Sequence, residues 1–331
     1  SAKTGFSTGA RSLATGLGSN PIGLDRGSGG DSYVTRFDKN GDRVLVVFEN
    51  WNYRSSATDN PAHVRTVVEA FPPSTTASLP LIAEEGSRLV VDATDFVMRD
   101  WNDVSGNLTG NNEGSYSVAK DRSSIYRPYT KAFPENSEID VALTFVTQGR
   151  PGPTVAAIVP EGRSFTLRQH LSFLKLPDNG YRPRVLDPRT GFFGIVFKDY
   201  AQPIQLPLEQ RWISRHRLER VNPSDPASPI KNPIVYYIDR GIPEPIRSAT
   251  KQGASWWADA FDRAGLRGAF KVEDLPEGVD PLDARYNVVQ WENRNERGWS
   301  IGGALGDPRD RRRGWPDRCD VRRAPGGDPV G

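Results

Sequence analysis

Residues 233–241, PIVYYIDRG, and residues 243–265, PEPIRSATKQGASWWADAFDRAG, set the architecture of the second half of the chain. The first stretch contains an uninterrupted apolar and aromatic run at 234–238, which predicts a short buried strand. In the second stretch, apolar residues recur from Ile246 at intervals of three and four residues, which predicts a helix. Gly265 follows the last predicted turn, where glycine commonly ends a helix.

Shorter apolar runs follow this helix at 269–272, 286–291 and 299–305, and each predicts a strand. The order strand, helix, strand, strand, strand predicts one domain over residues 234–308. Residues 222–233 precede it and contain four prolines mixed with Ser and Asp, a composition typical of a linker.

Residues 31–221 are predicted to form a separate β-rich domain. Asn40-Gly41 lies between apolar runs at 33–37 and 43–51 and predicts a hairpin. Asp59-Asn60-Pro61 predicts the start of a helix. Residues 1–30 are rich in Gly, Ser and Thr and are predicted to be a flexible segment. Further strands are predicted at 88–99, 139–146, 154–159, 165–173 and 192–197, and a further helix at 208–220.

Composition excludes several classes of protein. The chain has 331 residues, with 43 Lys and Arg against 41 Asp and Glu, and a formal net charge of +2. This balance argues against a general nucleic-acid-binding protein, which carries a basic excess. No apolar run approaches the ~18 residues that a membrane-spanning helix needs, and the first residues do not resemble a signal peptide.

The histidines offer little for a metal site. His63, His170 and His216 are too far apart for two imidazoles to share one helix face, so the chain has no H-E-x-x-H helix. His63 and His216 are expected to be solvated. His170 should lie opposite the apolar face of its strand, with Arg168 and Ser172, and a surface or cross-strand hydrogen-bonding role is favoured over a ligand role.

A series of motifs along the chain occurs in the order found in one family. They are LATGLGSN (13–20), GLDRG (23–27), VDATDF (91–96), GYRPR (180–184), PIVYYIDRG (233–241), PEPIR (243–247), ASWW (254–257), RYNVVQW (285–291), RGWS (297–300) and DPR (307–309). Together they resemble the bacterial zinc-dependent metalloproteases in which a metzincin-like catalytic domain follows a long domain of unknown function.

The resemblance implies the fold class and the biology of a parent protein. It implies an α+β protein, with a β-rich accessory domain followed by the N-terminal half of a zincin-like α/β catalytic domain. It also implies zinc and a peptide or protein substrate in the full-length parent, and a periplasmic or extracellular location.

The match to this family stops after Arg309. The family continues with Thr-Gly-Glu and later with an H-E-x-x-H-x-x-G-x-x-H helix, whereas residues 310–331 here match neither. We therefore predict that residues 309–331 are a disordered tail or a product of a shifted reading frame. No catalytic residue, metal ligand or cofactor is assigned to this chain, which we expect to be inactive. Without the active-site helix, the face carrying Trp256 and Trp257 should be partly uncovered and promote association.

One set of residues is predicted to lie near substrate. In metzincin-like domains, the strand before the active-site helix lies at the sheet edge and pairs with extended substrate. By resemblance, Ser300, Ile301, Gly302 and Gly303 lie near that cleft. The alternative is an ordinary internal strand.

Two other functions remain open at this point. The β-rich region could be a non-catalytic binding or scaffolding module, in which Trp51, Tyr53 and Trp101 form a recognition surface if they are exposed. An unrelated hydrolase could also use residues that are distant in sequence, because catalytic triads are defined by geometry.

Overall fold

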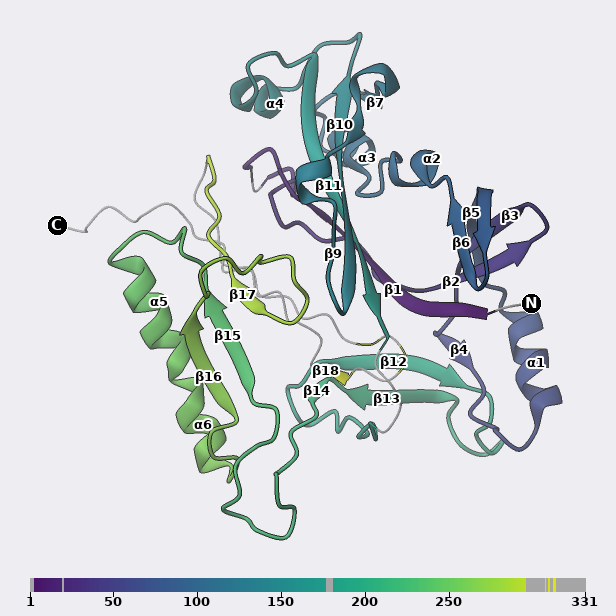
Figure 1. Cartoon of the computed structure of the whole chain (residues 1–331), viewed down its shortest axis with the longest axis vertical. Helices are drawn as coiled ribbons and strands as arrows, with labels where there is room; N and C mark the ends of the chain where they lie inside the picture. Colours follow the sequence, from purple (N-terminus) through teal and green to yellow (C-terminus); the bar gives the residue numbers. More distant parts are fainter. Residues whose placement is uncertain are drawn as a thin grey trace. The chain divides into compact units, whose positions relative to one another are not determined.

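The chain forms two compact units, made of residues 1–213 with 308–310 and residues 214–307 with 311–331. The computed structural model, drawn in Figure 1, describes residues 3–19, 21–176, 181–295, 307, 309 and 312–313. Within these residues, the structure is rich in strands and contains few helices. This secondary-structure content agrees with the predicted α+β class. None of the described helices is long and apolar enough to cross a membrane.

Ten described strands of the first unit form one antiparallel sheet, in the order β6-β5-β3-β2-β1-β11-β10-β7, with β8 and β9 also paired to β10. The predicted hairpin at Asn40-Gly41 is confirmed, and Gly41 adopts a positive φ of 61°. The strands are β1 (Lys3–Leu13), β2 (Tyr33–Asn40), β3 (Arg43–Phe48), β5 (Ser74–Glu85), β6 (Arg88–Val91), β7 (Ser117–Val118), β8 (Ser124–Ile125), β9 (Lys131–Ala132), β10 (Asn136–Val146) and β11 (Ser164–Lys175).

The prediction that residues 1–30 form a flexible segment is wrong for β1. This strand lies inside the sheet, between β2 and β11, and pairs with both. Its Gly, Ser and Thr residues carry no apolar periodicity. Strand formation therefore comes from hydrogen bonding to two neighbours that are distant in sequence, a signal that the segment itself does not contain.

Residue alternation gives β10 and β11 two different faces. Odd-numbered residues such as Leu143 and Leu167 pack into the hydrophobic core. Even-numbered residues such as Glu138, Asp140 and His170 lie on the opposite face and are also buried. Because successive side chains of a strand point to opposite faces, the sequence pattern alone produces this separation.

Short helices complete the first unit. Asn60 caps α1 (Pro61–Ala70) as predicted, since its Oδ1 accepts a hydrogen bond from the His63 backbone N–H at 3.1 Å. The strand predicted at 154–159 is wrong, because this segment is helix α4 (Pro153–Ile158). Glu113 Oε2 accepts the backbone N–H groups of Thr154 and Val155 at 3.0 and 3.1 Å, a cap supplied from outside the segment. The remaining helices are α2 (Thr94–Val97), α3 (Val104–Gly110) and the 3₁₀ turns η1 (Lys120–Arg122) and η2 (Arg127–Tyr129).

A second sheet of the first unit has the order β13-β12-β4 and consists of β4 (Tyr53–Arg54), β12 (Gly194–Asp199) and β13 (Glu209–Ile213). The helix predicted at 208–220 is therefore wrong. Trp212 packs edge-on against Phe197 of β12 at 4.5 Å between ring centroids. Antiparallel pairing with β12, the preceding strand of the chain, has outweighed the helical spacing of Leu208 and Trp212.

The second unit contains a parallel sheet of β15 (Ile234–Ile238), β16 (Phe270–Asp274) and β17 (Asn287–Val289), with β15 in the middle. The predicted helix forms as α5 (Ile246–Ser255) and α6 (Trp257–Arg263), which connect β15 to β16. Strand β14 (Arg215–His216) pairs with β18 (Arg312–Arg313). The strand predicted at 299–305 lies outside the described residues.

The proline-rich segment at 222–233 belongs to a closed loop of the second unit. Backbone hydrogen bonds join Val221 to Pro229 and Lys231 to Glu219, at 3.0 and 2.9 Å. Ile230 is buried in this loop. The two compact units divide between Ile213 and Ser214. The domain limits proposed from the sequence stay a prediction.

Candidate functional site

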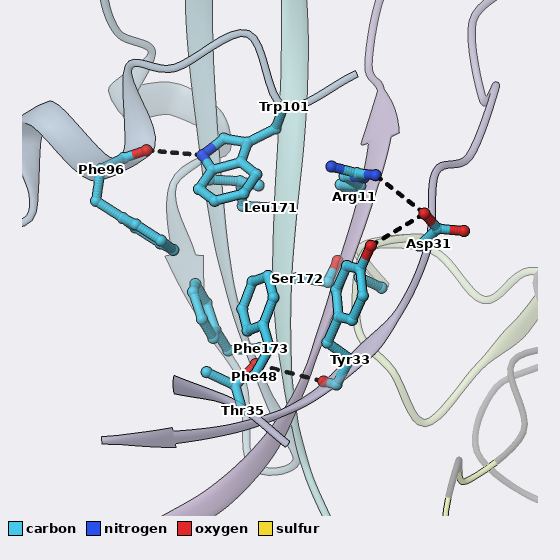
Figure 2. Close-up of a pocket in the computed structure, with 11 residues that line it drawn as sticks. Arg11, Asp31, Tyr33, Thr35, Phe48, Phe96, Trp101, Leu171, Ser172 and Phe173 are labelled. Carbon is cyan, nitrogen blue, oxygen red and sulfur yellow. Dashed lines mark hydrogen bonds and ion pairs between the residues drawn. The ribbon is translucent and has the colours of Figure 1, made fainter. Parts of the chain in front are cut away.

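A pocket lies beside the hydrophobic core of the first unit, and we call it the ring pocket (Figure 2). It is lined by the aromatic rings of Tyr33, Phe48, Phe96, Trp101 and Phe173, with Leu171 beside them. These side chains come from β2, β3, α2 with the turn that follows it, and β11. The ring pocket therefore exists only after the large sheet has assembled.

Contacts among the rings hold the pocket in shape. Tyr33 and Phe48 stack with centroids 4.4 Å apart and ring planes 7° apart. Phe96 meets Trp101 edge-on at 4.9 Å, and the indole Nε1 of Trp101 donates to the backbone oxygen of Phe96 at 2.7 Å. Offset and edge-on ring pairs are favourable geometries, so the walls are preformed.

Arg11 and Asp31 give the ring pocket a polar edge. Arg11 Nη2 and the Tyr33 hydroxyl both donate to Asp31 Oδ2, at 3.2 and 3.0 Å. Burial, followed by the hydrogen bond to Asp31 and the charge of that carboxylate, raises the pKa of Tyr33, so its hydroxyl stays protonated and remains a donor. Arg11 is more enclosed than Asp31, with side-chain exposures of 24% and 73%.

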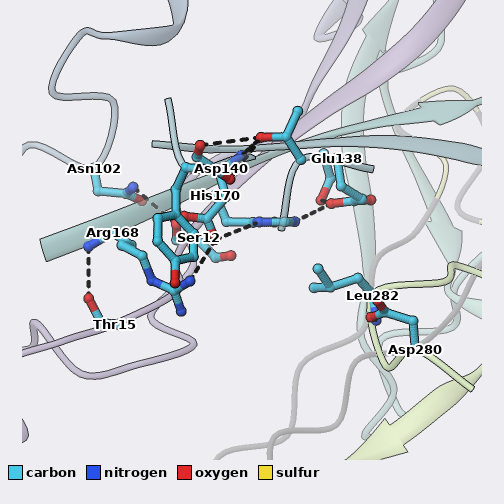
Figure 3. Close-up of polar contacts among 12 residues, drawn as sticks. Ser12, Thr15, Asn102, Glu138, Asp140, Arg168, His170, Asp280 and Leu282 are labelled. Atoms are coloured by element: carbon cyan, nitrogen blue, oxygen red, sulfur yellow. Dashed lines mark hydrogen bonds and ion pairs between the residues drawn. The ribbon is translucent and has the colours of Figure 1, made fainter. Parts of the chain in front are cut away.

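A second polar arrangement lies on the even-numbered face of β10 and β11 (Figure 3), and we call Glu138, Asp140, Arg168, His170 and Ser172 the buried polar cluster. His170 Nε2 contacts Glu138 Oε2, and its Nδ1 lies 3.6 Å from Asp140 Oδ2. Arg168 Nη1 lies 3.8 Å from the same Asp140 oxygen. The side chains of His170, Glu138 and Asp140 are at most 2% exposed.

Electrostatics explains why these groups occur together. A buried carboxylate is costly unless it is paired and hydrogen-bonded. His170 lies between the two carboxylates, with Nε2 in contact with Glu138 Oε2 and Nδ1 facing Asp140 Oδ2 across 3.6 Å. Arg168 supplies a positive charge beside Asp140 and lies over the rings of Tyr126 and Tyr129 at 4.5 and 4.6 Å.

The buried polar cluster does not have the geometry of an activated nucleophile. The Ser172 hydroxyl donates to Glu138 Oε2 at 2.6 Å rather than to His170. A serine activated by His170 would need a ring nitrogen of that histidine in contact with its hydroxyl. Nor do the described residues contain a group of three or more His, Cys, Asp or Glu side chains that could hold a metal ion. The arrangement therefore supports a structural role.

The structure describes only some of the residues that the sequence predicted to be functional. Ser300, Ile301, Gly302 and Gly303 lie outside the described residues, and their contact with substrate stays a prediction. His170 lies on the predicted face and takes the predicted cross-strand role, but it is buried rather than on the surface.

His63 and His216 do not belong to the buried polar cluster. His63 is half-buried in α1 and pairs through Nδ1 with the Ser55 hydroxyl at 2.9 Å, so the prediction that it is solvated is only partly right. His216 belongs to β14 of the second unit and is half-buried there.

Of the three aromatics predicted as a recognition surface, only Trp101 lines the ring pocket. Trp51 donates through Nε1 to Glu49, and Tyr53 stacks on Phe71 with centroids 4.2 Å apart. Sequence reasoning missed the other rings, because they come from separate elements. It also missed Glu138 and Asp140, although the polar residues at alternate positions 136, 138 and 140 could have revealed them.

Comparison with known proteins identifies a family. A family model described as Domain of unknown function (DUF5117) matches residues 27–220, more than half of the chain. The matched range includes all five rings of the ring pocket and the buried polar cluster, but not Arg11. No curated protein and no solved structure matches the chain. The chain therefore belongs to the family defined by the Domain of unknown function (DUF5117).

Proposed function

We propose that the chain is a segment of a zinc-dependent metallopeptidase, which hydrolyses peptide bonds in its full-length form. The observation that supports this most strongly is the order of the metalloprotease-like motifs over residues 13–309. The second unit is compatible with the proposal, because β15, α5 with α6, and β16 form a parallel strand–helix–strand unit with β17 on the other side of β15. Export to the periplasm or the extracellular space belongs to the same proposal.

The zinc chemistry cannot be assigned to the residues described. Zinc in such an enzyme polarises the scissile carbonyl and lowers the pKa of its bound water to about 7. The described residues do not fit this ion, because they offer no group of three ligands for it. On this proposal the ligands lie elsewhere in the parent polypeptide, and this chain by itself hydrolyses no peptide bond.

Sequencing of the coding DNA beyond the codon for Arg309 tests the proposal. We expect another reading frame to restore Thr-Gly-Glu and, further on, an H-E-x-x-H motif. The longer protein should then contain about one zinc per chain and cleave an unfolded protein substrate such as casein, with the 331-residue chain as the inactive control. A confirmed reading frame that lacks such a motif would contradict the proposal.

A second candidate function is favoured by the ring pocket. An apolar pocket with a few polar groups at its edge is the usual form of a binding site. Its rings are already held by contacts with each other, so little ordering is needed on binding. We propose that the DUF5117 region acts as a non-catalytic recognition module.

Hydrogen–deuterium exchange of the full chain tests this candidate. A pool of random hexapeptides should protect the backbone around Tyr33 and Trp101 from exchange. The same measurement on the backbone amides of Arg65 and Glu69 in α1, whose side chains are exposed, provides an internal control that should not change. An absence of protection at the ring pocket would contradict the recognition module.

A further inference from the structure

We propose that strand β6 pairs antiparallel with β6 of a second copy of this chain, so that the large sheet of the first unit continues across a twofold axis. Residues 88–92 form the pairing segment, and we call them the open edge. In this pairing Val90 meets Val90 of the second copy, and Arg88 meets Asp92. The inference goes beyond both candidate functions and depends on neither of them.

Strand β6 is the last strand at one end of the large sheet (Figure 1). It pairs with β5 on one side, and no described residue pairs with its other side. An edge strand of this kind presents a row of unpaired N–H and C=O groups to any strand that approaches. Natural proteins often block such an edge with proline or lysine, and residues 88–92 contain neither. The open edge can therefore accept a further strand.

The direction of the backbone groups defines which residues can pair outward. The Asp92 N–H donates to the Pro80 oxygen of β5 at 3.0 Å, so the backbone of Asp92 faces β5. Successive residues of a strand direct their backbone groups to opposite sides. The backbone of Val90 therefore also faces β5, whereas Leu89 and Val91 direct their N–H and C=O groups to the open side.

Antiparallel pairing about Val90 uses these outward groups. Leu89 of one copy forms a hydrogen-bonded pair with Val91 of the other, and twofold symmetry repeats this pair. The two Val90 residues form a pair without hydrogen bonds between them, which is the kind of pair in which side chains lie closest. A single register thus satisfies the outward backbone groups of both copies.

The side chains fit the same register. Val90 is 53% exposed, and Arg88 and Asp92 are exposed on the same face of the strand. Pairing about Val90 places Arg88 opposite Asp92 of the second copy at both ends of the contact, and opposite charges at facing positions stabilise a sheet. Leu89 and Val91 are half-buried against the hydrophobic core, so pairing extends this apolar face from one copy to the next.

Disulfide trapping tests the proposal, because so short a contact makes a weak and transient dimer. Every variant carries Cys319→Ser, which removes the sole cysteine, and Trp256→Gln with Trp257→Gln, which removes association through the tryptophans. Under mild oxidation Val90→Cys should give a covalent dimer, because Cα atoms about 4.5 Å apart suit a disulfide. The matched control is Val68→Cys on α1, which is 54% exposed and should give about tenfold less dimer or lower.

Charge reversal tests the register. Added to Val90→Cys, Arg88→Glu places two acidic groups opposite each other, and Asp92→Arg places two basic groups opposite each other. Each change should lower the dimer yield, because like charges at facing positions are destabilising. The two changes together restore opposite charges and should recover the yield. High salt should reduce all these differences, since it screens exposed charges. Circular dichroism checks that each variant is folded.

Several outcomes would overturn the pairing of two copies. One is a dimer yield from Val90→Cys no higher than that from Val68→Cys, and this comparison decides the proposal by itself if a charge variant does not fold. Another is a folded double reversal that gives no more dimer than the single reversals. A third is protection of the Leu89 and Val91 amides from exchange by added hexapeptides without any trapped dimer, which would assign the open edge to a foreign strand.

Discussion

At the scale of single residues, His170 depends on the two carboxylates beside it. Removing one partner of a buried hydrogen bond typically costs about 1–3 kcal/mol, and more beside a charged group, because the remaining group stays buried without its partner. We expect His170→Gln to lower the free energy of unfolding by this order, measured by urea denaturation. The matched control is Glu84→Gln, which breaks a surface pair with Lys39 and should cost about 0–1 kcal/mol.

A double-mutant cycle with Glu138→Gln shows whether the effect belongs to the pair. Glu138 contacts His170 directly, so the two substitutions should be strongly non-additive. Additive losses, or a loss in His170→Gln no larger than in the surface control, would contradict the paired, structural role of this histidine.

Asp199 makes a pH-dependent contribution to stability. Burial opposes its charge, but the Ser56 hydroxyl and backbone N–H, the Ala201 N–H and the Gln202 amide all donate to it, and together they lower its pKa. A carboxyl group whose pKa is lower in the folded state stabilises the fold above its unfolded pKa, near 3.9. That stabilisation is lost as the pH falls through the folded-state pKa.

Asp199→Asn should therefore lower the free energy of unfolding at neutral pH and make it less sensitive to acid below about pH 4. Denaturant titrations at several pH values measure this slope. Asp121→Asn, at an exposed position, is the control and should leave the slope unchanged. The interpretation fails if both variants lose stability in acid as steeply as the wild type does.

At the scale of elements, α4 depends on a cap from outside its own sequence. Glu113 is buried and accepts two of the first backbone N–H groups of this helix. Loss of a helix cap costs about 0.5–2 kcal/mol, so Glu113→Ala should lower the unfolding free energy by this order and speed exchange of the α4 amides. Glu69→Ala in α1 is the control, since Glu69 makes only a 4.0 Å surface pair with Arg65. Unchanged exchange at α4 would contradict the cap.

This helix also shows which elements the sequence could predict. The hairpin at Asn40-Gly41 and the start of α1 at Asn60 were predictable, because each signal lies within a few residues of the element it specifies. Elements β1 and α4 were not, because each depends on a partner that is distant in sequence.

The sites follow the same division between local and distant signals. The side chains of the buried polar cluster lie at alternate positions of β10 and β11. The face on which His170 lies was therefore predictable from the sequence, although the burial of His170 was not. The ring pocket combines side chains from several elements, and no local pattern brings Arg11 near Trp101. Only assembly of the sheet creates this site.

At the scale of the whole molecule, exposed tryptophans predict self-association. Trp256 and Trp257, at the junction of α5 and α6, are 71% and 62% exposed. Exposed apolar surface of this kind promotes association in water. We expect the apparent mass of the chain, measured by light scattering after size exclusion, to rise with concentration, and Trp256→Gln with Trp257→Gln to suppress that rise.

The control must show that these positions, rather than any exposed apolar residue, are responsible. Ile204 is 98% exposed in the first unit, and Ile204→Gln should leave the association unchanged. A wild-type chain that stays monomeric at every concentration would contradict the prediction. It would also weaken the proposal that this chain is a segment of a larger peptidase, because the proposal expects part of the second unit to be covered only in the parent protein.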